Sequence, residues 1–194
     1  YNASGFPRDA EAARYYLQWS GVPDSVYCAS GGESDYTDDF KSRGLWVNWL
    51  MGGSSKLPKQ AGLGIDIDMS LGFHSDAGIT QADSIIGTLG IYCTERRGRF
   101  ADGRRRLLSQ QLTDSVVSSI VRTITSNYRP DWSRRKMRDK PYAEARSPQV
   151  PAMLLELLSH QNPADMRLGL DPQFRFDVSR AVYKGIVRYF AATE

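Results

Sequence analysis

Histidines are scarce in this sequence, so the position of each one is informative. The chain of 194 residues has two. His74 follows a run of alternating apolar and polar residues, which predicts a strand, and precedes a small polar loop that contains Ser75 and Asp76. Sites in open α/β sheets lie just beyond the carboxyl ends of strands, so His74 is a candidate for chemistry. The alternative is a hydrogen-bonded residue at a strand end, with Asp76 either orienting the imidazole or capping a turn.

Glu156 is the most informative acid in the chain. It lies within the apolar run VPAMLLELLS, residues 150–159, which predicts a buried strand. An ionised carboxylate is costly to bury unless it is paired. Two interpretations stay open: an active-site carboxylate, or a strand-end residue paired with an arginine. His160 lies four residues further on, but the QNPAD that follows it argues against a helix, so no two-ligand helix motif is predicted.

Predicted strands alternate with predicted helices along the chain. Helices are expected over residues 7–21, 38–51, 107–126 and 175–191, and strands over residues 22–28, 65–73, 84–93 and 150–159. The segments 128–149 and 159–174 are expected to be loops, the first with short extended pieces. This order predicts one α/β domain with an open, mostly parallel twisted sheet and helices on both faces.

Composition narrows the classes of function. The 25 basic and 22 acidic residues give a net charge of +3, which is too balanced to require a nucleic-acid partner. No apolar run is long enough to span a membrane. Cys28 and Cys93 each follow a strand-like stretch, and a disulfide between them stays open; no Cys/His cluster indicates a structural zinc site.

Three segments resemble the zinc-dependent N-acetylmuramoyl-L-alanine amidases that cleave peptidoglycan, in a branch associated with secreted proteins of Bacteroidetes-type bacteria. FHSDAG resembles the family's histidine segment, and SDYTDDFKSRGLWVNWL resembles the helix before it. The C-terminal block carries the most specific match. Its matching residues are Val150, Pro151, Glu156, Asn162, Pro163, Asp165, Gly185, Ile186, Tyr189 and Phe190. The resemblance covers the chain from about Glu11 onward.

The resemblance implies a zinc (Zn2+) site and its residues. A catalytic zinc takes three protein ligands and one water, and a nearby glutamate moves the water's proton. By resemblance, His74 is a zinc ligand, Glu156 is the general acid/base, and Glu11 is a second ligand or else a first-turn helix acid. Ser75 and Asp76 are expected to line the site.

The same resemblance gives Asn162 a place beside the substrate, holding the loop after the catalytic strand. The basic loop after Cys93 includes Arg96, Arg97 and Arg99, which are either solvated or contacts for stem-peptide carboxylates.

The chain departs from the family at the first zinc ligand. The family has a histidine in an H-x-G-H-G-G segment after its first strand, and this sequence has no such segment. We therefore expect residues 1–194 to form a single amidase-like catalytic domain without its first strand and first metal-ligand segment, in a larger multidomain chain. The alternatives are a degenerate site, or His160 in place of the absent ligand.

The predicted function is hydrolysis of the amide bond between N-acetylmuramic acid and L-alanine in peptidoglycan or muropeptides. This implies a periplasmic or extracellular location, although no signal peptide is visible. Two rival functions stay open: a non-catalytic cell-wall glycan- or peptide-binding module on the same fold, and a related zinc carboxypeptidase.

Overall fold

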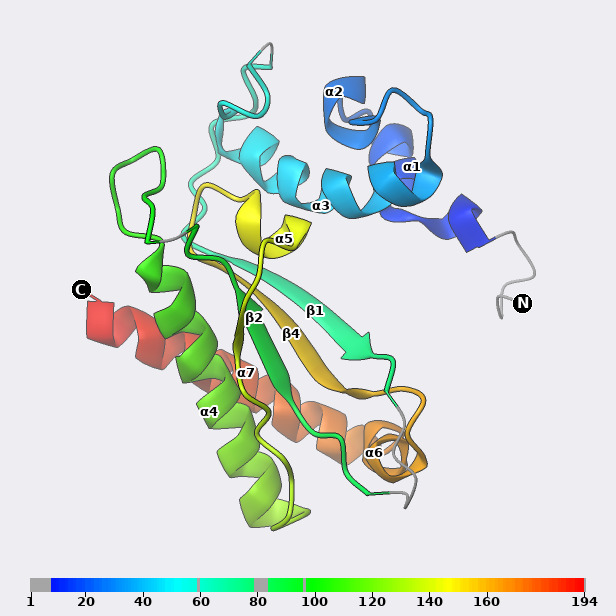
Figure 1. Ribbon diagram of the computed structural model, residues 1–194, viewed down its shortest axis with the longest axis vertical. Helices are drawn as coiled ribbons and strands as arrows, with labels where there is room; N and C mark the ends of the chain where they lie inside the picture. Colours follow the sequence, from blue (N-terminus) through cyan, green and yellow to red (C-terminus); the bar gives the residue numbers. More distant parts are fainter. Residues whose placement is uncertain (1–7, 59, 79–83, 96, 194) are drawn as a thin grey trace.

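A four-stranded mixed sheet organises the chain, whose computed structural model describes residues 8–58, 60–78, 84–95 and 97–193. Its strands, in the spatial order β1-β4-β2-β3, are β1 (Ser70–Asp76), β4 (Ala152–Ser159), β2 (Leu89–Tyr92) and β3 (Arg138–Asp139). The β1–β4 and β2–β3 pairs are parallel and the β2–β4 pair is antiparallel. Figure 1 shows β4 between β1 and β2. The prediction of a mostly parallel α/β sheet is confirmed.

Helices lie on both faces of this sheet, as predicted. They are η1 (Arg8–Glu11), α1 (Ala13–Trp19), α2 (Asp24–Tyr27), α3 (Asp35–Met51), α4 (Leu107–Asn127), α5 (Ala143–Arg146), α6 (Pro163–Gly169) and α7 (Pro172–Thr193). The long helices α4 and α7 pack together behind the sheet, while the short α5 lies in front of it and contacts α3 (Figure 1). No helix in the described ranges is long and apolar enough to cross a membrane. Cys28 and Cys93 are free thiols.

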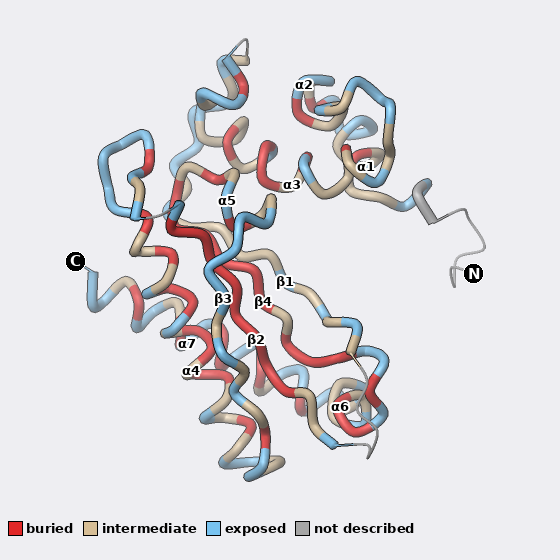
Figure 2. Tube along the Cα trace, viewed as in Figure 1, coloured by how far each residue is buried: buried red, intermediate tan, exposed pale blue. Residues whose placement is uncertain are grey.

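The main core lies between the sheet and the helices α4 and α7. Helix α4 presents Leu112, Val116 and Ile120 at intervals of four residues, which places them on one face. They meet Met153 and Leu155 of β4, and all five side chains are fully buried. Figure 2 shows buried stretches of α4, α7 and the central strands in red. Burying one such side chain contributes about 1.5–3 kcal/mol. The contact with α4 thus uses one face of β4, and Glu156 lies on the opposite face.

Short elements were predicted least well. The strand expected over residues 22–28 is wrong: Asp24–Tyr27 is a helix, with Pro23 at its N-cap position and an acid in its first turn. The loop expected over residues 159–174 is also wrong, since it contains α6, which Asn162 caps and Pro163 starts. A segment as short as the four residues of α2 fits a helical period and a strand period equally well, so the sequence pattern alone could not decide its structure.

Element boundaries also moved. The strand expected over residues 65–73 begins at Ser70 and continues to Asp76, so His74 lies within β1 and not beyond it. The first predicted helix divides into the 3-10 turn η1 and helix α1 from Ala13. Its expected first residue, Pro7, lies outside the described residues.

The close packing of α4 on α7 depends on Gly185, one of the residues that match the amidase block. A Cβ atom at this position would lie 2.6 Å from the Cα of Val116 and 3.1 Å from the carbonyl oxygen of Ser115. Contacts this short have no room for a methyl group. The glycine is therefore explained by helix packing.

Replacing Gly185 with alanine should destabilise the fold. Alanine gains about 1 kcal/mol of helix propensity, but overpacking typically costs about 1–3 kcal/mol and here involves backbone on both sides. We expect Gly185→Ala to lower the free energy of unfolding by about 1–2 kcal/mol in urea denaturation. Lys184→Ala, at the exposed neighbouring position, should change it by less than about 0.5 kcal/mol. A Gly185→Ala variant as stable as the wild type would contradict this account of the helix contact.

Candidate functional site

The strand register places three candidate side chains on one face of the sheet. His74 of β1 is the register partner of Glu156 on β4. Glu156 is in turn the partner of Leu89 on β2, and Ile91, two residues along β2, is the partner of Arg138 on β3. Because paired residues point to the same face, His74, Glu156 and Arg138 share the face opposite the α4–α7 core. We call it the polar face.

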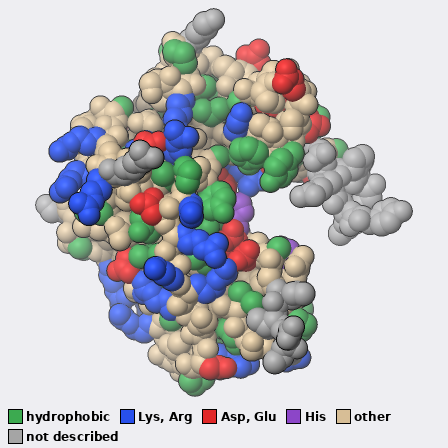
Figure 3. Space-filling view, in the orientation of Figure 1, with side chains coloured by type: hydrophobic (Ala, Val, Ile, Leu, Met, Phe, Trp, Pro, Cys, Tyr) green, Lys and Arg blue, Asp and Glu red, His purple; other side chains and the backbone are tan. Residues whose placement is uncertain are grey.

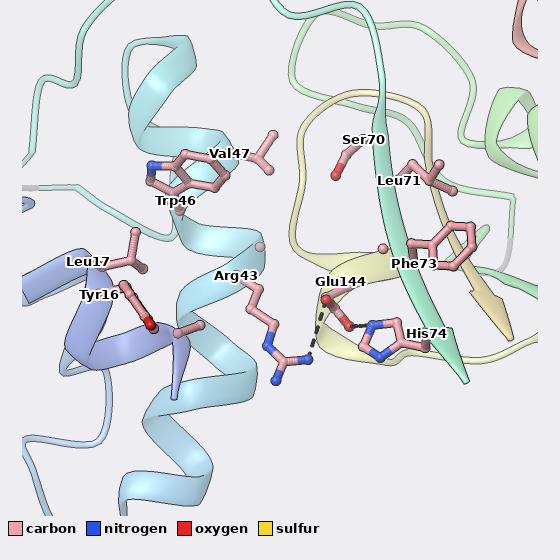
Figure 4. A pocket seen from close by; sticks show the side chains of 13 residues that line it. Tyr16, Leu17, Arg43, Trp46, Val47, Ser70, Leu71, Phe73, His74 and Glu144 are labelled. Carbon is pink, nitrogen blue, oxygen red and sulfur yellow. Dashed lines mark hydrogen bonds and ion pairs between the residues drawn. The ribbon is translucent and has the colours of Figure 1, made fainter. Parts of the chain in front are cut away.

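His74 is held by a residue that the sequence analysis missed. Its Nε2 lies 2.8 Å from Oε2 of Glu144 on α5, and the other oxygen of Glu144 lies 3.6 Å from Nη1 of Arg43 on α3 (Figure 4). Gly72 leaves the room for this pair, since a Cβ there would lie 3.3 Å from the Glu144 carboxyl. The hydrogen bond with Glu144 raises the pKa of His74 above its ordinary 6.5, against the opposing effect of partial burial, and the charges of Glu144 and Glu156 act in the same direction.

Helix α5 is fixed where Glu144 can reach His74 by a buried amide on α3. The side chain of Asn48 donates to the carbonyl oxygen of Ser147 at 2.9 Å and accepts from the backbone N–H of Gln149 at 2.9 Å. Asn48 is fully buried, so breaking either bond would leave an unpaired polar group. The position of Glu144 is therefore set by the segment that joins α5 to β4.

Glu156 is half-buried on the polar face, and one of its oxygens has no partner. Oε2 is inaccessible to solvent and has no hydrogen-bond donor in the described ranges. Burial raises the pKa of Glu156, the negative charges of Asp76 and Glu144 add to this, and His74 and Arg135 oppose it. A carboxyl group with a raised pKa can accept and return a proton near neutral pH, which suits a general acid/base.

Asp76 lies near Glu156, but its pKa is shifted in the opposite direction. Its Oδ2 accepts from Nη1 of Arg135 at 2.6 Å, and its Oδ1 accepts from the backbone N–H of Ala77 at 2.8 Å. Burial alone would raise the pKa of Asp76, but these two bonds and the charges of Arg135 and Arg138 lower it below its usual value. The pKa of Asp76 is therefore lowered and that of Glu156 is raised, although the two carboxyl groups are neighbours.

The remaining predicted residues lie elsewhere. Ser75 is exposed on the other side of β1, where its hydroxyl lies 3.0 Å from Nδ1 of His160. His160 is thus next to Ser75 and is not hydrogen-bonded to His74. Glu11 is exposed at the end of η1, two residues before Ala13, which lines the cavity beside His74. The structure brings together His74, Asp76 and Glu156, and the roles of Ser75 and Glu11 stay predictions.

Asn162 and Asp165 hold the loops at one end of the sheet. Asn162 is fully buried, accepts from the backbone N–H of Asp165 at 2.9 Å and donates to the carbonyl oxygen of Ser84 at 2.9 Å. Asp165 accepts from the backbone N–H groups of Ile86 and Ser159, each at 2.9 Å. Asn162 therefore holds the loop after β4, as expected, and a direct contact with substrate stays a prediction that this burial does not favour.

Two cavities, each of about 470 Å³, flank β1 on its two sides. The first lies between β1 and the helices α1 and α3; Tyr16, Leu17 and Trp46 line one wall and the His74–Glu144 pair lines another (Figure 4). The second lies between β1 and helices α6 and α7. In Figure 3, histidine and acidic side chains show in a hollow on this side of the molecule, rimmed by basic and apolar side chains. The polar face is accordingly open to a ligand.

The donors on the polar face do not make a zinc site. Across residues 8–58, 60–78, 84–95 and 97–193, no three histidine, cysteine, aspartate or glutamate side chains are grouped so that they could hold a metal ion. Nε2 of His74 is already bonded to Glu144. A catalytic zinc takes three protein ligands, and the described residues do not complete that set. The expected zinc ligands, His74 and Glu11, stay predictions.

Comparison with known proteins shows the fold. No protein-family model matches the chain, and no curated protein does. The solved structure of the CwlD amidase from Clostridioides difficile, in complex with the GerS lipoprotein, superposes with a TM-score of 0.59 at 16% identity, over 92% of this chain and 81% of that one. The chain has an amidase fold. An N-acetylmuramoyl-L-alanine amidase from Clostridium difficile 630 superposes with a TM-score of 0.57 at 17% identity, over 88% and 81% of the two chains.

The His74–Glu144 contact makes a prediction about one imidazole. Replacing Glu144 with glutamine removes the carboxylate charge and keeps the shape, so the pKa of His74 should fall toward its ordinary value of about 6.5. An NMR titration can measure this directly, because the chain has two histidines and His160→Asn assigns their signals. An unchanged titration of His74 in Glu144→Gln would show that the contact does not exist in solution.

Proposed function

We propose that this chain is a peptidoglycan hydrolase of the N-acetylmuramoyl-L-alanine amidase type, which cleaves the amide bond between N-acetylmuramic acid and L-alanine. The observation that carries the proposal is the partly buried carboxyl group of Glu156, one oxygen of it unpaired, opposite His74 on an open polar face of an amidase fold. Structural cores rarely leave such a group unpaired, whereas active sites use it. A cell-wall substrate places the protein outside the cytoplasm.

The residues of the polar face suit amide hydrolysis. Glu156 accepts a proton from the attacking water and returns it to the leaving amine of L-alanine, two steps that one group with a raised pKa can perform. Glu144 stabilises the protonated form of His74, and in that form the imidazole supplies positive charge on the same face, where the amide oxygen becomes negative. Asp76 and Arg135 stay paired and ionised and fix the charge around Glu156.

One observation favours a second candidate function. The described residues do not complete a three-ligand metal set. A cell-wall-binding module on an amidase fold would need the cavities beside β1 and not the metal. Product analysis separates the two candidates, because a binding module releases no product.

Digestion of purified muropeptides tests the proposal. The wild type should release intact stem peptides with a free L-alanine amino terminus, and Glu156→Gln should lower the rate by at least about 100-fold, the usual contribution of a general acid/base. Glu33→Gln, at an exposed glutamate of the α2–α3 loop, is the matched control and should retain full activity. Cleavage elsewhere in the stem, or an active Glu156→Gln variant, would contradict the proposal.

The same variant has an expected effect on stability. Because the pKa of Glu156 is raised in the folded protein, its contribution to stability is fully present below the ordinary value of 4.5 and is lost as the pH rises through the folded value. Glu156→Gln should therefore increase the free energy of unfolding at pH 7.5, by at most about 1 kcal/mol because solvent screens this half-buried group, and differ little from wild type near pH 4. Urea denaturation at the two pH values measures this, and a variant less stable at pH 7.5 would show that Glu156 is a structural residue.

The zinc implied by the family resemblance is a separate prediction. Because the described residues supply fewer than three placed ligands, we expect residues 1–194 to lose zinc on dialysis against a mild chelator, with well under one equivalent left by mass spectrometry. His74→Ala should lower the zinc bound before dialysis, and His160→Ala should not. A full equivalent retained through dialysis would contradict this expectation and support the complete ligand set.

A further inference from the structure

A third cavity lies on the polar face over strands β2 and β4, and Asp76 at the end of β1 borders it. Its volume is about 170 Å³, which suits one or two small groups of a ligand. Its floor consists of Leu89, Ile91 and Leu154, three apolar side chains of β2 and β4 that are at least nine-tenths buried and cluster together. Glu156 and Asp76 stand at one end. We call this space the Arg138 pocket, after the residue at its other end.

Arg138 supplies a positive charge at the other end of the pocket. The sheet register pairs it with Ile91, so it lies on the polar face at the far end of the pocket, beside Tyr142 (Figure 2 shows β3 next to β2). Arg134 and Arg135, a few residues earlier, are paired with Asp114 at 2.5 Å and with Asp76 at 2.6 Å. Within the described ranges no acidic side chain lies within ion-pair distance of Arg138, and the residue is exposed. Its guanidinium is available for an anion.

The dimensions of the pocket fit a short peptide. Strand β3 lies two strand spacings from β4, about 10 Å between backbones. An extended dipeptide spans about 7 Å, and the long arginine side chain covers the remaining distance. A peptide whose amino end lies at Glu156 would then place its first side chain on the apolar floor and its second residue beside Arg138 and Tyr142.

We propose that the Arg138 pocket binds the first two residues of the stem peptide and selects a free carboxylate on the second. The methyl group of L-alanine lies on the floor made by Leu89, Ile91 and Leu154. The carboxylate of the following acidic residue pairs with the guanidinium of Arg138, and the Tyr142 hydroxyl donates a hydrogen bond to it. Arginine suits this role because its planar group can bind a carboxylate through two hydrogen bonds. The inference rests on the proposed function, which sets the amino end of L-alanine at Glu156.

Two dipeptides that differ in one group test the pocket without requiring catalysis. One is L-alanyl-D-glutamate with a free α-carboxylate, and the other is L-alanyl-D-isoglutamine, which carries an amide at that place. The γ-carboxyl group is amidated in both, so that the α position is the sole difference. Binding of each to the wild type, to Arg138→Gln and to Arg134→Gln is measured by NMR titration. Arg134 is the matched control, because its side chain pairs with Asp114 on α4, on the other face of the sheet. The corresponding muramyl dipeptides give kcat and KM for the same three proteins.

The wild type and Arg134→Gln should bind the free acid about tenfold more tightly than the amide, the usual effect of one charge-assisted hydrogen bond. Arg138→Gln should bind both equally, with the loss appearing in KM and not in kcat. Equal binding by the wild type, unchanged preference in Arg138→Gln, or no binding of either dipeptide would overturn the pocket assignment. Arg138-dependent preference without cleavage of the muramyl substrates would support the pocket and overturn the proposed hydrolase function alone.

Discussion

A single carboxyl group in the long, largely buried strand β4 is the constraint on which the polar face depends. Strand β4 is apolar except for Glu156 and its last residue, Ser159, and Met153 and Leu155 on one side of it form the centre of the main core. An ionised carboxylate at that place loses much of its hydration. The structure balances this loss only in part, with the imidazole of His74 across the strand pair and the guanidinium of Arg135 nearby. A site assembled for stability alone would pair the carboxylate fully or replace it with an apolar residue.

The residues that most resemble the amidase block stabilise the structure in different ways. The hydrogen bonds of Asn162 and Asp165 described above are to backbone groups of the loops and strand ends, and the close contacts of Gly185 are to α4. Asp165 ties the end of β4 to the loop before β2 through the backbone N–H groups of Ser159 and Ile86, and Gly185 lets α7 approach α4. Asp165 thereby holds the segment before β2 against the end of β4, where Leu89 lies beside Glu156. The match in the C-terminal block is therefore mainly a match of scaffold, with Glu156 as its one chemical group.

Sequence patterns found the long elements and the rare residue types, and missed what depends on register. Helices α4 and α7 are long and strongly periodic, so their patterns were unambiguous, whereas α2 and α6 are too short for a period to show. His74 and Glu156 stood out because a histidine at a strand end and an acid in an apolar run are unusual. Glu144 gave no such signal: it lies 70 residues from His74, in a stretch that reads as a polar loop, and the two meet only because Asn48 holds the segment after α5.

The two faces of the sheet explain why catalysis and recognition would share one surface. Helices α4 and α7 cover the part of one face formed by β2 and β4, so any polar group placed there would have to be buried. On the other face, α5 has four residues and leaves the remainder open from His74 on β1 to Arg138 on β3. Ionisable groups of both signs lie along that row. Asp76 has a lowered pKa and Glu156 a raised one, and two strands away lies the guanidinium of Arg138, which has no ion-pair partner among the described residues. A substrate that lies across the strands would meet the acid/base first and the cation second, so the spacing of the strands itself would set which part of the substrate each group contacts.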